Sequence, residues 1–383
     1  MRFPEFSGEW EICKVSELLD FYSTNSLSWE QLEYGEKAMM NLHYGLIHVG
    51  LPTMVDLRRD KLPNVKEGNM PKNFELCKEG DVAFADASED TNEVAKVIEL
   101  FNLDNKDIVC GLHTIHGRDN KNKTIVGFKG YAFSSSAFHN QIRRIAQGTK
   151  IYSISTKNFS ECYVGIPSKA EQTKIATLLR LIDERIATQN KIIEDLKKLK
   201  SAITDLLFHS IADAHTIRLG KIAHITNGAG DVQDANTEHQ EDWYPFFDRS
   251  EELKWFPTYS FDKEAVIYAG EGQSFYPRYY NGKFALHQRC YAITDFASCI
   301  IPKYCYHFMN TLNSYFVRNS VGSTVPSLRM DIFQKVEIRL PPIPKQQHIC
   351  KIIDAFYTKL EVEQRGISIL QELKQFLLSQ MFI

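Results

Sequence analysis

The sequence predicts an α+β protein in which two globular units alternate with two long helices. A seam of apolar residues recurs every three or four positions from Ile175 to Leu207, which is typical of a helix that pairs with another helix. Residues 148–208 recur once, without a gap, as residues 322–382, so the seam has a second copy. Two similar halves in one chain predict an internal repeat with pseudo-two-fold symmetry.

Each predicted helix has one apolar stripe and therefore needs a partner, so we expect the two stripes to bury each other. Polar residues interrupt the stripe at matching places, because Gln189 corresponds to Glu363 and Lys200 to Lys374. From the helices alone, a coiled-coil scaffold remains an alternative. The residues expected to pair are Ile182, Ile186, Ile193, Leu196, Lys200 and Ile203 in the first helix, with Phe356, Leu360, Glu363, Ile367, Leu370, Lys374 and Leu377 in the second.

Composition limits the possible classes of protein. A chain of 383 residues exceeds the usual size of one domain. A formal charge of −3 argues against a protein that coats nucleic acid by charge alone, although a local basic face stays possible. The 8 cysteines form no CxxC pair, which disfavours a disulfide framework or a zinc site. Without a signal peptide or a long apolar run, we expect a soluble, cytoplasmic protein that binds no metal and no membrane.

Local patterns along the chain predict the remaining elements. Residues 43–50 and 109–116 have the apolar character of strands, whereas residues 92–100, 131–146 and 298–317 favour helices. Pro167 and Ser168 mark the start of the first long helix, with Ser168 as its cap.

Side chains that read base edges concentrate in glycine-rich stretches of the second unit, at residues 269–280 and 282–289. Glycine allows close backbone approach, and Gln, Ser and Arg bond to bases and phosphates. The alternative is a glycine-rich hairpin with a solvated charged tip. The candidate DNA contacts of this unit are Asn227, Arg249, Gln273, Ser274, Arg278, Tyr280, Lys283, His287, Gln288 and Arg289.

The first unit offers a smaller set of candidates. Residues 111–118 could supply base contacts from His113, Thr114 and Arg118, and the polar loop at residues 22–28 adds Asn25. Arg143 and Arg144 are either a basic pair at a helix end or phosphate contacts. Because His113 and His116 would face opposite sides of a strand, they are not expected to bind a metal together.

Several catalytic signatures are missing from the sequence. It contains no Asn-Pro-Pro-aromatic motif, no glycine-rich S-adenosylmethionine loop after a strand, no Walker A sequence and no convincing PD…ExK cluster. We therefore expect a reader of DNA with no catalytic residues. A stand-alone DNA methyltransferase or nuclease is the alternative from another class.

Over essentially its whole length the chain resembles the specificity (S) subunit of type I restriction-modification systems. The motifs that carry the resemblance are Phe-Pro-Glu-Phe-Ser-Gly-Glu-Trp at residues 3–10, Gly-Leu-His-Thr at 111–114, the stretches 268–272 and 281–291, and the Glu171-Gln172 motif with its second copy at 344–347. The chain departs from the family where Gly-Glu-Gly at 270–272 replaces Gly-Asp-Gly and at Gln-Ser-Phe at 273–275. Because of these departures, the resemblance does not identify which bases this chain would read.

The resemblance implies two target recognition domains, each reading one half of a split sequence in double-stranded DNA. It implies that the two helices form an antiparallel coiled coil, set the distance between the halves and dock two methyltransferase (M) subunits, which restriction (R) subunits join. S-adenosylmethionine would belong to the M subunits, and ATP and Mg to the R subunits, so this chain would bind no cofactor. The expected regions are recognition domain 1 at 1–150, a central region with the first helix at 151–212, recognition domain 2 at 213–325 and a distal region with the second helix at 326–383.

In an antiparallel pair, several axial registers are possible, each one heptad apart. Full overlap would bury Lys200 beside Ile349, at a cost in desolvation. A shifted register sets Lys200 opposite Glu363 and Gln189 opposite Lys374, which predicts that both polar layers are satisfied together. The alternative is that the lysines extend to water.

Overall fold

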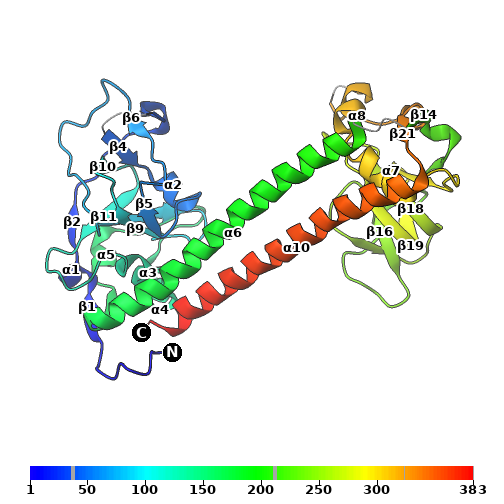
Figure 1. Ribbon diagram of the computed structural model, residues 1–383. Coiled ribbons are helices and arrows are strands. Elements are labelled where there is room, and N and C mark those ends of the chain that lie inside the picture. The colour runs from blue at the N-terminus through cyan, green and yellow to red at the C-terminus, as the bar shows by residue number, and fades with distance from the viewer. Residues whose placement is uncertain (36–38, 210–213, 323, 383) are drawn as a thin grey trace. The chain divides into compact units, whose positions relative to one another are not determined.

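The computed structural model describes residues 1–35, 39–209, 214–322 and 324–382 (Figure 1). The chain divides into two compact units, Met1–Lys191 with Arg365–Ile383, and Ile192–Gln364. Each unit contains one mixed domain together with part of α6 (Lys169–His209) and part of α10 (Ile343–Gln380). The predicted α+β class is confirmed. The expected boundary at 212/213 lies outside the described residues, and the four domain limits stay predictions.

The first unit is built on two small sheets. A five-stranded sheet has the order β2 (Asp20–Tyr22), β11 (Thr114–Arg118), β7 (Val82–Ala85), β9 (Val97–Asn102), β5 (Met54–Asp56). A four-stranded sheet has the order β10 (Asp107–Cys110), β4 (Met39–Leu42), β6 (Asn64–Val65), β3 (Leu32–Glu33). Two short pairs complete it, β1 (Glu11–Lys14) with β13 (Tyr163–Ile166) and β8 (Ala87–Ser88) with β12 (Tyr152–Ser153).

Short helices complete this unit. They are α1 (Val15–Leu18), η1 (Trp29–Gln31), α2 (Tyr44–His48), α3 (Lys129–Phe133), α4 (Ser136–Ile145) and α5 (Thr156–Ser160). Phe84 of the sheet packs edge-on against Phe133 and Phe159 of these helices, and all three rings are fully buried. Aromatic packing of this kind anchors the domain core.

The second unit has one six-stranded sheet, in the order β15 (His224–Asn227), β20 (Cys290–Thr294), β18 (Phe261–Ala269), β19 (Arg278–Leu286), β16 (Tyr244–Phe247), β17 (Lys254–Phe256). A separate pair joins β14 (His215–Arg218) to β21 (Glu337–Leu340). The helices of this unit are η2 (Leu219–Lys221), η3 (Val232–Asp234), α7 (Pro302–Met309), α8 (Asn313–Asn319) and α9 (Met330–Gln334).

The predicted internal repeat is visible in equivalent hydrogen bonds of the two units. The side chain of Gln172 donates to the Lys123 and Pro167 carbonyls and accepts from the Ile125 amide, at 2.9 to 3.1 Å. Gln346 is equally buried and repeats the pattern with Cys299, Pro341 and Ile301, at 2.8 to 2.9 Å. Each glutamine ties the first turn of a long helix to its own domain, because buried amides must be satisfied.

Local sequence signals set where the long helices begin. The Ser168 hydroxyl accepts from the Glu171 amide at 3.3 Å, so Ser168 caps α6 as predicted. The second helix begins at Ile343, and the Gln346 amide donates to the Pro342 carbonyl at 3.1 Å. Proline suits these positions because the first helical amides have no partner inside the helix.

Within each unit the two long helices run antiparallel. In the first unit Ile175 and Leu179 near the start of α6 share a core with Leu377 and Phe382 at the end of the chain. In the second unit Phe208, near the end of α6, shares a core with Ile349 and Ile353 near the start of α10. None of the 13 residues expected to pair is classed as exposed.

The axial register of this pairing differs from the polar register predicted from the sequence. Lys374 Nζ lies 2.6 Å from Asp183 Oδ1, and Lys200 Nζ lies 4.1 Å from the centre of the Tyr357 ring. Glu363 instead pairs with Lys359 of its own helix. Tyr357 is six residues from Glu363, or about 9 Å of helix rise, so the prediction that Lys200 faces Glu363 is wrong.

Packing at the helix ends accounts for this register. Phe382 packs against Trp10 and Phe128, with ring centres 6.2 and 5.9 Å apart. Its repeat equivalent Phe208 packs against Tyr304 and Phe308, at 5.5 and 5.4 Å. These buried aromatic contacts stabilise one alignment more strongly than two polar pairs in the seam could stabilise another.

Some local predictions were wrong. Residues 92–100, expected as a helix, contribute to β9, and residues 43–50, expected as a strand, form α2. The helices expected at 131–146 and 298–317 are each divided in two, α3 with α4 and α7 with α8. In the first of these Ser135 interrupts the helix, because its hydroxyl caps α4 by accepting from Phe138 at 3.3 Å.

Candidate nucleic-acid interface

Four loops of the second unit meet, and we refer to residues 226–230, 247–250, 270–274 and 286–290 as the second loop cluster. Backbone bonds join them: the Gly228 amide donates to Cys290, Gly230 to Leu286 and His287 to Phe247, at 2.9 to 3.2 Å. The loops follow or precede β15, β16, β18 and β20 of one sheet. Loops held together by a rigid sheet are the usual carriers of binding residues.

Two glycines make this close packing of loops possible. A Cβ atom on Gly228 would lie 2.0 Å from the Leu286 carbonyl oxygen, and one on Gly270 would lie 2.0 Å from that of Arg289. Any other residue would push the loops apart, and Gly270 thereby has the close-approach role expected of it.

The second loop cluster presents most of the candidate DNA contacts of this unit. Asn227, Arg249, Gln273, Ser274, Gln288 and Arg289 are exposed on it, and His287 is half-buried. Arg289 pairs with Glu271 at 2.9 Å, while Asn227 donates to the Gln288 carbonyl at 3.3 Å. The structure therefore brings together side chains that are up to 62 residues apart in the chain, from Asn227 to Arg289.

Three candidates of this unit are engaged in contacts within the domain. The Arg278 guanidinium donates to the Asp248 carbonyl at 3.0 Å and to that of Ser250, holding the 247–250 loop. The Tyr280 ring packs on Phe247, and the Lys283 ammonium lies 4.7 Å from the centre of the Tyr259 ring. No contact described for Lys283 joins it to the cluster.

The first unit has an equivalent arrangement, formed by residues 86–90, 111–113 and 151–153, which we call the first loop cluster. His113 directly precedes β11, and its Nδ1 lies 3.1 Å from Asp86, the residue that follows β7. Arg289 directly precedes β20 and pairs with Glu271, just after β18. His113 and Arg289 thus occupy matching positions on matching strand pairs, β11–β7 and β20–β18.

His113 has a backbone conformation that is uncommon among non-glycine residues. Its φ angle is 54°, in the left-handed region that non-glycine residues rarely adopt. Such strain is found at functional sites more often than elsewhere. The side chain is 51% exposed, so the strained residue is also accessible to a ligand.

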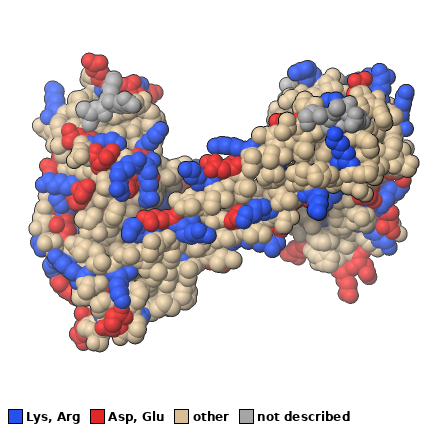
Figure 2. Space-filling model, in the orientation of Figure 1, with Lys and Arg blue, Asp and Glu red and all other residues tan. Residues whose placement is uncertain are grey.

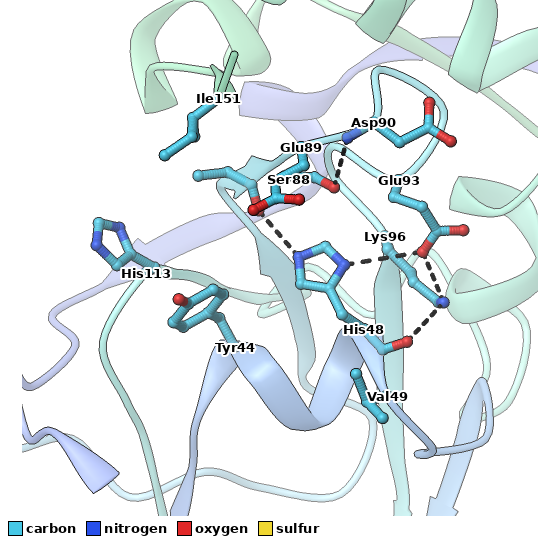
Figure 3. A pocket seen from close by; sticks show the side chains of 11 residues that line it. Tyr44, His48, Val49, Ser88, Glu89, Asp90, Glu93, Lys96, His113 and Ile151 are labelled. Atoms are coloured by element: carbon cyan, nitrogen blue, oxygen red, sulfur yellow. Dashed lines mark hydrogen bonds and ion pairs between the residues drawn. The ribbon is translucent and has the colours of Figure 1, made fainter. Parts of the chain in front are cut away.

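A cavity of about 680 Å³ adjoins His113 (Figure 3). Figure 3 shows His113 and Tyr44 on one side, with His48, Glu93 and Lys96 on the other. His48 Nε2 lies 2.9 Å from the Ala87 carbonyl, and Lys96 pairs with Glu93 at 2.6 Å. The walls combine aromatic faces with carboxylate, imidazole and ammonium groups, a mixture that suits planar polar ligands.

Three candidates of the first unit are occupied inside the domain. Arg118 is buried, pairs with Asp81 and Glu75 at 2.8 and 2.7 Å, and lies against the Tyr22 ring. Thr114 is buried and donates to the Gly111 carbonyl at 2.6 Å. Asn25 donates to the Cys110 carbonyl at 2.9 Å. The polar atoms of these three side chains already have internal partners, so the structure gives no support to the predicted DNA contacts from them.

Asp81 is the centre of this buried polar group. Burial raises the pKa of its carboxyl group, but hydrogen bonds from His116 and Arg118 outweigh burial, so the pKa lies below its ordinary value. Asp81 therefore stays charged and holds Arg118 in place. This pairing leaves no local pattern in the sequence, because Asp81 and Arg118 are 37 residues apart.

Arg143 and Arg144 lie in the last turn of α4 and are exposed. The Arg143 guanidinium donates to Asn92 at 3.0 Å and also to Asn140. Their position is the helix-end placement that the sequence suggested, where a cation is favoured by the helix dipole. A role in phosphate contact stays a prediction.

Charge on the face shown in Figure 2 is mixed, with acidic and basic side chains interspersed on both helices. This agrees with the formal charge of −3. Recognition of an anion by such a surface depends on a few placed groups more than on overall charge. Among the described residues, no helix has the length and apolarity needed to cross a membrane.

Sequence reasoning missed Asp86, Glu271, Tyr44 and His48, which contact or surround the candidate residues. One signal could have found the two carboxylates. His113 in the Gly-Leu-His-Thr motif and Arg289 in the His-Gln-Arg-Cys motif each stand directly before a strand. Aligning the two motifs matches these strands, β11 and β20, and the carboxylates follow the strands paired with them, β7 and β18.

Comparison with known proteins supports one family. A family model described as type I restriction modification DNA specificity domain matches residues 60–198 and again residues 212–375. The specificity subunit of the type I restriction enzyme EcoDI of Escherichia coli is 30% identical over 165 residues, covering 43% of this chain and 36% of that protein. A putative type I specificity subunit of Mycoplasma pneumoniae is 25% identical over 224 residues, covering 54% of this chain and 79% of that protein.

Solved structures share the fold. The S subunit of a type I restriction-modification system from M. genitalium superposes with a TM-score of 0.62 at 16% identity, covering 100% of this chain and 99% of that one. A chain from a structure of complex assembly and conformational transition in the type I R-M system has a TM-score of 0.62 at 15% identity, with 98% and 97% covered. Both likenesses concern the fold alone.

Proposed function

Because the chain belongs to the family of type I restriction modification DNA specificity domains, we propose that it is the DNA-recognition subunit of a type I restriction-modification complex. In this proposal, the first and second loop clusters each read one half of a bipartite sequence in double-stranded DNA.

The observation that carries the proposal is the pair of equivalent loop clusters with different side chains. His113 beside Asp86 in one unit matches Arg289 beside Glu271 in the other. To read two different half-sites, the two units need the same fold but different polar side chains on their loops. A scaffold protein without DNA contacts would not need these matched polar side chains on both loop clusters.

The chemistry of the second loop cluster supports base reading in the major groove. Arginine bonds guanine through O6 and N7, and glutamine bonds adenine through N6 and N7. Arg289 is 66% exposed and paired to Glu271, so exchanging that partner for a base costs little. Glu271 then positions the guanidinium until DNA arrives.

Replacing Arg289 with Ala tests this assignment. If Arg289 reads a base, binding to the preferred sequence weakens by about 1–3 kcal/mol and one position of the site loses its preference. Selection of bound sequences from a random library by the full complex measures both effects. Arg218→Ala is the matched control, because Arg218 is an exposed arginine on β14, outside the cluster.

Two results of that experiment would contradict the proposal in different ways. Uniform weakening across all sequences would make Arg289 a phosphate contact only. Unchanged affinity together with unchanged base preference would remove the second loop cluster from the DNA interface and favour a coiled-coil scaffold.

The partners follow from the same proposal. Two methyltransferase (M) subunits dock on the helices and carry S-adenosylmethionine, and restriction (R) subunits with ATP and Mg complete an endonuclease. This chain positions the DNA and performs no chemistry itself. Incubating the purified chain with labelled S-adenosylmethionine and target DNA should give no methylation until M subunits are added. Methylation by the chain alone would support the rival reading as a stand-alone methyltransferase.

A further inference from the structure

Cys77, Cys110 and His116 come together in the interior of the first unit. Their ligand atoms lie within 4.8 Å of one another, and all three residues are buried. The two sulfur atoms are 3.6 Å apart. In the described part of the chain this is the one group of three or more such residues found. Scattered cysteines without a CxxC pair had argued against a zinc site, but folding brings two of them together.

One ring nitrogen of the buried His116 lacks a hydrogen-bond partner. Its Nε2 lies 2.7 Å from Asp81 Oδ2, whereas its buried Nδ1 has no hydrogen-bond partner. When Nε2 carries the proton and donates to Asp81, the lone pair on Nδ1 is left without a donor. Leaving a buried acceptor unsatisfied is costly, and a metal ion that accepts this lone pair removes the cost.

We propose that Cys77, Cys110 and His116 bind a zinc ion through Sγ, Sγ and Nδ1. Two sulfurs and one imidazole nitrogen are the donor types that zinc prefers, and sulfurs about 3.8 Å apart are what tetrahedral bonds of about 2.3 Å require. The Asp81 carboxylate on the other ring nitrogen is the outer partner that metal-bound histidines usually have. These residues supply three of the four positions of a tetrahedral zinc site.

Charges around the proposed site balance. Zinc binds thiolates, so binding releases two protons, and the two negative sulfurs neutralise the 2+ ion. Asp81 is neutralised separately by Arg118, whose Nη2 lies 2.8 Å away. No net charge is left buried, which is the condition for a stable ionic group in a protein interior.

The site lies directly beneath the first loop cluster. Cys110 ends β10 and His116 lies in β11, so the 111–113 loop spans the two ligands. The Cys77 amide donates to Ile108 at 2.8 Å, which adds a third segment. A bound ion would join these segments and hold the loop that carries His113, whether or not His113 contacts DNA.

Metal analysis of the full chain tests the proposal. Untagged protein, purified without chelator from zinc-supplemented cells, should contain about one zinc per chain by elemental analysis, and Cys110→Ala should retain less than about one tenth. Cys13→Ala is the matched control: Cys13 is a buried free thiol of the same unit that bonds no cysteine or histidine among the described contacts. The Cys13→Ala variant should retain as much zinc as the wild type.

Cobalt substitution keeps the test decisive if Cys110→Ala folds poorly. Wild type and Cys13→Ala loaded with cobalt(II) should show thiolate-to-metal charge transfer and intense tetrahedral bands, and a chelator should lower the melting temperature of the zinc form. Wild type that contains no zinc, takes up none and keeps its melting temperature would overturn the proposal. A Cys77–Cys110 disulfide in freshly isolated protein, detected by mass spectrometry, would overturn it as well.

Discussion

At the scale of the residue, Arg289 and Arg118 show how burial separates recognition from structure. Both were candidates for DNA contact by residue type. Arg289 is 66% exposed in a surface ion pair, whereas the Arg118 side chain is 8% exposed and bonds Asp81, Glu75 and the Leu76 carbonyl. An arginine side chain can thus be available to a ligand in one unit and stabilise the fold in the other.

Arg118→Ala should therefore act on stability and not on sequence preference. Removing the guanidinium leaves the buried Asp81 carboxylate with one fewer partner, and breaking such a pair typically costs about 3–5 kcal/mol. Urea denaturation measures the loss as a lower free energy of unfolding for the first unit. Base preference in the folded fraction should match wild type. A well-folded variant with one relaxed base position would return Arg118 to the interface.

The two seam lysines, Lys200 and Lys374, are equivalent in the repeat but differ in their partners. Lys374 meets Asp183, whose other oxygen accepts from the Tyr131 hydroxyl at 2.8 Å. Burial and then the Asp183 charge raise the pKa of Tyr131, so the phenol remains a donor. Lys200 meets only the face of Tyr357 among its described contacts.

Lys374→Leu should destabilise the protein by about 2 kcal/mol, since Asp183 loses its cation in a mostly buried place. Lys200→Leu should change stability by less than about 1 kcal/mol, because a lost cation–π contact is offset by apolar packing on the ring. Denaturation midpoints compare the two variants. Asp183→Asn added to Lys374→Leu should recover part of the loss. Equal effects at both lysines would contradict the partners described.

At the scale of the element, the two helices are candidates for a ruler. They contain 41 and 38 residues, and 41 residues at 1.5 Å each give roughly 60 Å. Asp183 pairs with Lys374 in the first unit, and Lys200 lies against Tyr357 in the second. The division into two units falls between Lys191 and Ile192 in α6 and between Gln364 and Arg365 in α10.

Inserting one seam-matched heptad before Ile192 and another after Gln364 should therefore preserve all pairs within each unit. The helices lengthen by about 10 Å, and we expect the gap between the two half-sites to grow by about three base pairs. Methylation-sensitive sequencing of host DNA reads the gap. A heptad in one helix only is the control and should destabilise the pair, because the register is lost. An unchanged gap in the double insertion would refute the ruler.

At the scale of the whole molecule, the repeat predicts that the two units work independently. Replacing residues 1–150 with the corresponding domain of a relative should change one half-site only. The Gln172 side chain bonds backbone atoms of Lys123 and Ile125, so it tolerates a new sequence. Tyr131, which bonds Asp183, should be kept in the replacement. A change in both half-sites would contradict independent reading.

The sequence by itself determined the architecture of this protein. Periodicity of the apolar seam specifies long helices, and repetition of that seam specifies a duplicated fold, because both signals depend on residues close together in the chain. The cap at Ser168 and the close approach at Gly270 were also predictable, since turns and helix starts are local. His113 and Arg289 were identified as candidates from motifs alone.

Only the tertiary structure decided which of these residues can act. Arg118 and Arg289 look alike in the sequence, and their difference in burial arises from Asp81 and Glu75, which lie up to 43 residues away. The register of the helices depends on Phe208 and Phe382 packing into separate cores. Cys77 and Cys110 become neighbours because β10 lies beside the segment that holds Cys77. Burial and proximity come from contacts between distant parts of the chain, and such contacts leave no local pattern to read.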